Sequence, residues 1–262
     1  QHLAAKYGYP FLPRPYVQGC TSIGAEPRSE TAPSVLMFLA DWFQGYHEFH
    51  LSVDPEDRLQ KLVLWDTEKG PRLLWEEQSM EVYRQAAFIL SLYYDVDTFE
   101  QIFPWHHGAG DFVVKAKRGA LDVRLVTARQ YAPMIDPDHG IPLTEALLFF
   151  LLNLSLRMRL DRIDGTGPVA WAENPCVDAT LKGFMEGLRE KERRETTNDG
   201  LVKTFLRHCV SLSEEDLSER FQALVDACDP SAPDMPVIRR HLFEHTRKIC
   251  SVFQEVFAKN PP

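Results

Sequence analysis

The sequence predicts an α+β fold, in which a small strand-rich N-terminal part, residues 1–70, precedes a mainly helical part, residues 71–262, that contains a β-hairpin at 112–127. Two observations support this prediction. Proline, glycine and turn residues recur along the first part and interrupt any long helix there. From residue 74 onward, apolar residues recur at spacings of three and four, as on one face of a helix. Strands early and helices late are typical of the α+β class.

The N-terminal part is predicted as short strands joined by loops. Residues 35–43 and 46–53 have the composition of two strands hinged at Gln44-Gly45, and residues 61–65 (KLVLW) form a third that ends in the turn at 66–70. The run 35–43 is almost continuously apolar, so periodicity alone does not distinguish a strand from a helix there.

A core helix is predicted over residues 74–94, because Val82, Ala86 and Ile89 fall on one face. Residues 112–115 and 122–127 are rich in β-branched side chains and are predicted as two strands of a hairpin that turns at 117–119. The segment between the helix and the hairpin is therefore held by regular elements on both sides.

After a turn-rich zone at 133–142, the remainder is predicted to be helical. Ser213 stands before three acidic residues and is the predicted N-cap of one of these helices. Gly165 is predicted to end the first of them, and Arg157, Asp161 and Asp164 are expected to stack along it at spacings of four and three. The predicted helices cover 143–160, 177–195, 201–212, 214–228 and 237–257.

Composition and charge argue against several classes of partner. The formal net charge is −9 with the acidic residues scattered, so we expect no nucleic acid partner. The most apolar run, 146–152, is too short to cross a bilayer, and the first residues lack the apolar core of a secretion signal, so we expect no membrane and a cytoplasmic location. The cysteines are widely spaced and are expected to be reduced, and they are Cys20, Cys176, Cys209, Cys228 and Cys250.

The segment 105–111 (WHHGAGD) has the composition of a functional site. Imidazoles move protons near neutral pH, a carboxylate binds cations or accepts a proton, and glycines let a ligand approach the backbone closely. A tight turn whose histidines fill polar gaps explains the same composition equally well. The candidate catalytic residues are His106, His107 and Asp111, the candidate metal ligands are Asp111 and His107, and the candidate ligand-contacting glycines are Gly108 and Gly110.

A second group of titratable residues lies at 47–50. In a strand, Glu48 and His50 share one face, whereas in a helix His47 and His50 share a face and are spaced to bind one metal ion. The HExxH spacing of zinc proteases is absent, so an ordinary half-buried strand is the favoured interpretation.

The order of predicted elements resembles the protein-kinase-like fold of the aminoglycoside phosphotransferase type over about residues 30–190. The resemblance implies a catalytic Asp in the loop after the long helix and a cation-binding Asn just before the next strand, where Asp111 stands. It implies a second metal-binding carboxylate at the end of the strand 122–127, where Thr127 stands instead. Lys61 and Arg14 are the basic residues in the early strands that the resemblance offers for a phosphate contact.

Three functions stay open on this evidence, and the sequence does not decide whether the chain is catalytic. The first of them is favoured, because the order of helix, loop and hairpin gives the His and Asp segment a setting that the other two leave unexplained. The first is a phosphotransferase-like or nucleotide-binding protein, active or degenerate, in which Asp111 binds Mg²⁺ with a nucleotide or other small ligand and His106 or His107 acts as base or contacts phosphate. The second is a metal-dependent hydrolase that uses the same His and Asp residues, joined by His47 or His50. The third is a non-catalytic binding or assembly module.

Overall fold

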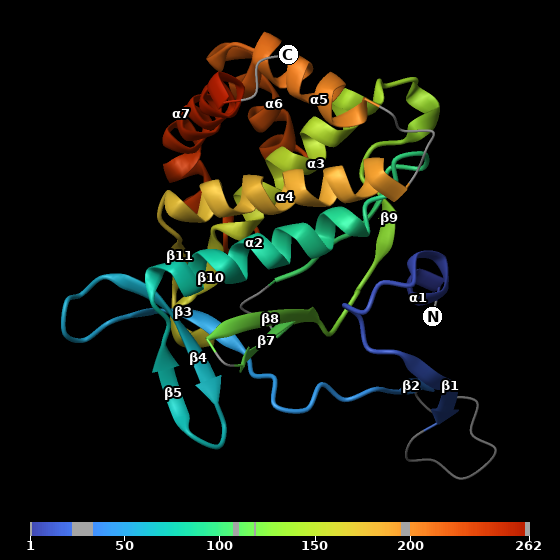
Figure 1. Cartoon of the computed structure of the whole chain (residues 1–262), viewed down its shortest axis with the longest axis vertical. Helices are drawn as coiled ribbons and strands as arrows, with labels where there is room; N and C mark the ends of the chain where they lie inside the picture. The colour runs from blue at the N-terminus through green and yellow to red at the C-terminus, as the bar shows by residue number, and fades with distance from the viewer. Residues whose placement is uncertain (1, 23–33, 107–109, 118, 195–199, 260–262) are drawn as a thin grey trace.

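The computed structural model describes residues 2–22, 34–106, 110–117, 119–194 and 200–259, and it has the predicted α+β architecture (Figure 1). The first part of the chain is rich in short antiparallel strands, and the C-terminal part is mainly helical. The predicted helices and strands are present, and the differences concern their ends and their partners.

The N-terminal part contains two separate antiparallel sheets. The apolar run that the sequence left ambiguous is a strand, β2, and it pairs with β1 rather than with the strand that follows it. The short helix α1 was not predicted. The elements are α1 (His2–Tyr7), β1 (Pro15–Ser22), β2 (Ser34–Ala40), β3 (Phe49–Val53), β4 (Gln60–Asp66) and β5 (Gly70–Leu73), and β3, β4 and β5 form the three-stranded sheet in that order.

The predicted core helix is α2 (Glu76–Leu92), and it packs along α4 (Pro175–Arg194), as Figure 1 shows. The close approach depends on Gly183 in α4, because a Cβ built there would overlap the carbonyl oxygen of Arg84 in α2. One turn later, a Cβ at Gly187 would lie 2.6 Å from the Cβ of Ser91. The two helices therefore touch backbone to backbone along this stripe, and no larger residue fits without separating them.

The predicted hairpin is formed by β7 (Phe112–Lys117) and β8 (Ala120–Leu125), with Phe112 opposite Leu125. Two short strands frame it, since β6 (Glu100–Ile102) pairs with β9 (Tyr131–Pro133). The loop between β6 and β7 contains the candidate site, so that segment is anchored on both sides by paired strands.

The helical remainder differs from prediction where the first helix ends. Helix α3 stops at Met158, and residues 160–162 pair as a strand with residues 169–171, so Asp161 lies in a strand and Asp164 in a 3-10 turn. Gly165 therefore does not end α3, and the expected helical stack of Arg157, Asp161 and Asp164 is wrong. The elements are α3 (Leu143–Met158), β10 (Leu160–Arg162), β11 (Val169–Trp171), α5 (Leu201–Ser211), α6 (Glu214–Asp226) and α7 (Met235–Lys259).

The predicted N-cap of α6 is confirmed. The backbone N–H of Asp216 donates to Oγ of Ser213 at 3.1 Å, and the N–H of Ser213 donates to the Asp216 carboxylate at 2.9 Å. This reciprocal pair is a capping box, which satisfies two backbone donors at the helix start.

The core is one continuous apolar cluster that joins the sheet β3–β5, the hairpin β7–β8 and the helices. The apolar run 146–152 lies in this core, as α3. Within the described part of the chain, no helix combines the length and apolar character that a membrane crossing requires. All five cysteines are free, and Cys176 and Cys209 are buried, whereas Cys20 is exposed on β1.

Candidate functional site

The candidate segment 105–111 begins in the hydrophobic core rather than at the surface. The side chain of Trp105 is buried, and its ring meets that of Phe112 edge to face, with the centroids 5.9 Å apart. Trp105 therefore anchors the loop to the hairpin, and the polar residues that follow it are positioned from this fixed point.

Asp111 is buried, with 1 % of its surface exposed, and its carboxylate binds a guanidinium. Nε of Arg129 donates to Oδ1 at 3.2 Å and to Oδ2 at 3.1 Å, and Nη2 of Arg129 donates to Oδ1 at 2.9 Å. The backbone N–H of His106 donates to Oδ2 at 2.8 Å. Three N–H groups therefore donate to this carboxylate, with the Nε–H of Arg129 shared between its two oxygens, so both oxygens accept hydrogen bonds.

The backbone N–H and carbonyl groups of Asp111 are also hydrogen-bonded. Its N–H donates to the carbonyl oxygen of His106 at 3.3 Å, and its carbonyl oxygen accepts from the N–H of Val126 at 2.7 Å. The hydrogen bonds from Arg129 to Asp111 raise the pKa of that guanidinium above its ordinary value. Asp111 thus closes the loop onto the segment that follows β8, as a structural ion pair.

Magnesium does not fit the residues described at this position. The oxygens of Asp111 that a cation needs already accept hydrogen bonds from Arg129 and His106, and Thr127 follows β8 where the family resemblance calls for a second carboxylate. Among the described residues, no three His, Cys, Asp or Glu side chains gather as metal ligands. His107 and Gly108, two of the predicted site residues, lie outside the described residues.

The remaining predicted site residues do not converge on one ligand. Gly110 has a φ of +73°, which favours glycine, and a Cβ there would lie 2.8 Å from Oε1 of Glu48. Lys61 in β4 donates to Asp54 and to Asp57, at 2.5 Å each, and these two hydrogen bonds raise its pKa. Lys61 borders a different pocket, of about 610 Å³, and its charge is already neutralised.

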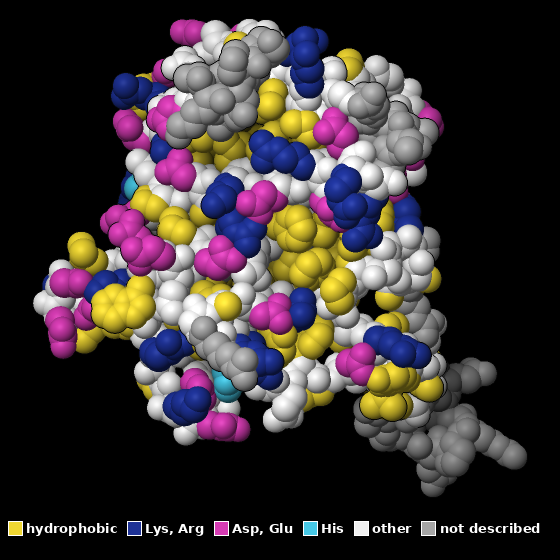
Figure 2. All heavy atoms as spheres, in the orientation of Figure 1, with side chains coloured by type: hydrophobic (Ala, Val, Ile, Leu, Met, Phe, Trp, Pro, Cys, Tyr) yellow, Lys and Arg dark blue, Asp and Glu magenta, His cyan; other side chains and the backbone are white. Residues whose placement is uncertain are grey.

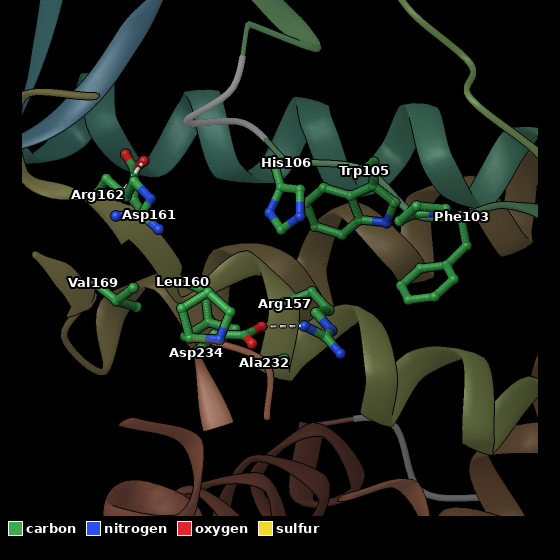
Figure 3. A pocket seen from close by; sticks show the side chains of 12 residues that line it. Phe103, Trp105, His106, Arg157, Leu160, Asp161, Arg162, Val169, Ala232 and Asp234 are labelled. Atoms are coloured by element: carbon green, nitrogen blue, oxygen red, sulfur yellow. Dashed lines mark hydrogen bonds and ion pairs between the residues drawn. The ribbon is translucent and has the colours of Figure 1, made fainter. Parts of the chain in front are cut away.

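His106 faces a pocket of about 380 Å³ (Figure 3). Trp105 and His106 lie along one side of it, and Arg157 and Asp234 form an ion pair across from them. Apolar walls come from Phe103, Leu160 and Val169. The pocket has the size of a small-ligand site, and its exposed polar groups are the His106 ring and the Arg162 guanidinium.

A buried histidine links this pocket to the sheet. The strand interpretation of residues 47–50 is confirmed for Phe49 and His50, which begin β3, whereas His47 forms an isolated bridge with Val114. Nε2 of His50 lies 3.6 Å from Oε2 of Glu48, and Nδ1 of His50 lies 3.9 Å from Oδ1 of Asp161. Burial lowers the pKa of His50, but the carboxylates of Asp161 and Glu48 raise it by more, so the net pKa is above the ordinary value. The Trp65 ring covers His50, with the centroids 4.6 Å apart.

Sequence reasoning missed Arg129, which decides what Asp111 does. One signal was available in the sequence. The family resemblance calls for a metal-binding carboxylate at position 127, and the chain has Thr127 there and the cationic Arg129 two residues later. Sequence reasoning also missed Asp161 as the partner of His50. These residues are 111 positions apart in the sequence, and Asp161 was expected to continue the helix that ends at Met158.

Comparison of the chain with protein-family models, with curated proteins and with solved structures gives no match. What can be said of its function therefore rests on the geometry of these residues.

Proposed function

We propose that this protein is a non-catalytic binding or assembly protein, in which the segment 105–111 has a structural role. One observation carries the proposal: both oxygens of the buried Asp111 carboxylate accept hydrogen bonds, from Arg129 and from the backbone of His106. A group committed in this way is available neither as a general base nor as a ligand of a cation.

Phosphoryl transfer depends on carboxylates that hold Mg²⁺ against the phosphates. In this chain a guanidinium stands beside Asp111, and Thr127 stands where the kinase-like plan has a second carboxylate. Lys61, the candidate phosphate contact, is bound by two carboxylates of its own. These features favour a non-catalytic binding protein over a phosphotransferase and over a metal-dependent hydrolase.

Thermal unfolding with added ligands tests the proposal. We expect no change in Tm with millimolar Mg²⁺ or with Mg²⁺ and ATP together, because no cation site is open at Asp111. A Mg²⁺-dependent rise in the Tm of the wild-type protein with ATP would overturn the proposal.

A second candidate, nucleotide or anion binding without transfer, is favoured by the pocket beside His106. It combines apolar walls with two exposed cationic or titratable groups, His106 and Arg162. This candidate predicts a rise in Tm with ATP in the presence of EDTA, and its loss in R162Q. A matched control is R193Q, because Arg193 lies on an exposed stretch of α4 outside that pocket.

A further inference from the structure

A separate cavity, of about 220 Å³, lies between α3, α6 and β6. Tyr94, just after α2, and Gln101, in β6, form part of its wall, and the segment between β9 and α3 closes one side. The cavity shares no lining residue with the pocket beside His106. It is therefore a second place where a small ligand can enter, independent of the segment 105–111.

The wall of this cavity is uncharged and mainly apolar. Charged side chains of both signs are scattered over the face of the molecule shown in Figure 2, whereas none of the described residues that line the cavity is charged. An ionised ligand would lose its hydration here without gaining a partner. Aromatic rings form much of the wall, and they belong to Tyr94, Phe99, Phe149 and Phe150. These features select a neutral ligand with an apolar, preferably aromatic, body.

Gln101 is the polar exception in this wall. Only 4 % of its surface is exposed, and no hydrogen bond between described residues involves its side-chain amide. Buried amides normally form hydrogen bonds, because an unpaired one costs stability. Since Gln101 lines the cavity, a ligand there is the partner that its amide lacks.

The hydroxyl of Tyr94 is in the same situation. Tyr94 is 1 % exposed, and its ring stacks on that of Phe150 with the centroids 4.6 Å apart, but its hydroxyl has no hydrogen-bond partner among the described residues. The nearby Tyr7, by contrast, donates its hydroxyl to Asp95. Burial raises the pKa of Tyr94, so its hydroxyl stays protonated and can donate. One apolar cavity is thus lined by two buried polar side chains without a protein partner.

The volume limits the size of the ligand. An apolar cavity of about 150 Å³ holds one benzene molecule. A cavity of about 220 Å³ therefore admits a ring with a short side chain, or about nine non-hydrogen atoms in total. A hydroxyl on that side chain both donates and accepts, so it can bond with the Gln101 amide or with the Tyr94 hydroxyl.

We propose that this cavity binds a small neutral aromatic alcohol, whose ring lies among the aromatic side chains of the wall and whose hydroxyl is hydrogen-bonded by Gln101, by Tyr94 or by both. Such a ligand supplies the partner that no described side chain supplies. The inference goes beyond the proposed function, because it assigns a ligand class to a cavity that the segment 105–111 does not line.

Methyl NMR of the full chain with 2-phenylethanol, which has the expected size, tests the proposal. We expect the methyl signals of Ile135 and Ile141, which line the cavity, to shift and to saturate with a Kd in the millimolar range or tighter. Q101M keeps the length of the side chain and removes the amide, and Y94F removes only the hydroxyl. At least one of these variants should weaken 2-phenylethanol binding by about 3- to 10-fold. Neither should weaken binding of ethylbenzene, which has the same ring and no hydroxyl.

Two controls separate ligand binding from a structural role. In Y46F the lost hydroxyl is one that donates to Asp122 outside the cavity, so the affinity for 2-phenylethanol should equal that of the wild type. The Tm of Q101M and of Y94F should not fall, because neither change breaks a hydrogen bond between described residues. A fall in the Tm of the variant that weakens binding would assign that residue a structural role and remove it from the site.

Three results would overturn the proposal. The first is the absence of a saturable shift in the wild type at tens of millimolar 2-phenylethanol. The second is equal or tighter binding of phenylacetate, whose negative charge this wall should reject. The third is unchanged 2-phenylethanol binding in both Q101M and Y94F, or an equal loss of ethylbenzene binding. None of these results depends on Mg²⁺ or ATP, so failure of this proposal is distinguishable from failure of the proposed function.

Discussion

Removal of the Arg129 guanidinium tests whether Asp111 has a structural role. In R129A the buried carboxylate keeps its hydrogen bond from the His106 N–H and loses the hydrogen bonds from Nε and Nη2 of the guanidinium. Breaking a fully buried ion pair costs about 3–5 kcal/mol, but the Arg129 side chain is 45 % exposed, so solvent screens the charge and water can replace part of the contact. We therefore expect the free energy of unfolding to fall by about 2 kcal/mol.

Removal of the carboxylate should cost more, because Asp111 also fixes the loop through His106. We expect D111A to lose about 3 kcal/mol, and the double variant to lose about the same as D111A alone, since Arg129 has no buried charge left to satisfy. The difference, a coupling of about 2 kcal/mol, is measured by urea unfolding of the four proteins with the m value checked for constancy.

The control is R193A, which removes an arginine with two hydrogen bonds to Glu190 on an exposed helix surface. Its stability should not change measurably, because exposed pairs contribute little. The structural role of Asp111 is refuted if R129A is as stable as R193A, or if D111A and R129A are additive in the double variant.

Two further predictions concern the protein interior. The pKa of His50 is raised in the folded state by Asp161 and Glu48. The protonated ring therefore stabilises the fold below its unfolded pKa of about 6.5, and this contribution is lost as the pH rises through the folded pKa. The unfolding free energy of the wild type should fall above pH ~6.5, and the H50Q variant should not show this fall. The G183A substitution would stabilise an isolated helix by about 0.5–1 kcal/mol. In this protein it should instead lower the free energy of unfolding by at least about 2 kcal/mol, because the added Cβ overlaps the carbonyl oxygen of Arg84. A gain in Tm would contradict the observed contact between α2 and α4.

The elements that the sequence predicts correctly are those set by local patterns. The 3.6-residue periodicity of α2, the β-branched strands on either side of Gly119 and the Ser213 cap each depend on residues close together in the chain. Pairing is not local. The end of α3 at Met158 depends on β11 pairing with β10, and the partner of β2 lies before it in the chain rather than after it.

In the candidate site, too, the sequence predicts local features and misses contacts between distant residues. Composition singles out 105–111, because the segment combines a tryptophan, histidines, glycines and a carboxylate just before a strand. It does not reveal whether the carboxylate is free. That is set by Arg129, which is 18 residues away in sequence and reaches Asp111 because β7 and β8 are paired. The commitment of Lys61 to Asp54 and Asp57 is likewise a matter of side-chain geometry that no spacing rule expresses.

The contact of Gly110 with Glu48 has a mechanical consequence. A Cβ at position 110 would meet the end of the Glu48 side chain, which is 54 % exposed and can turn away from it. Its carboxylate would then leave Nε2 of His50, whose other neighbouring carboxylate, Asp161, lines the pocket. Glycine at position 110 therefore leaves room for the Glu48 carboxylate beside His50.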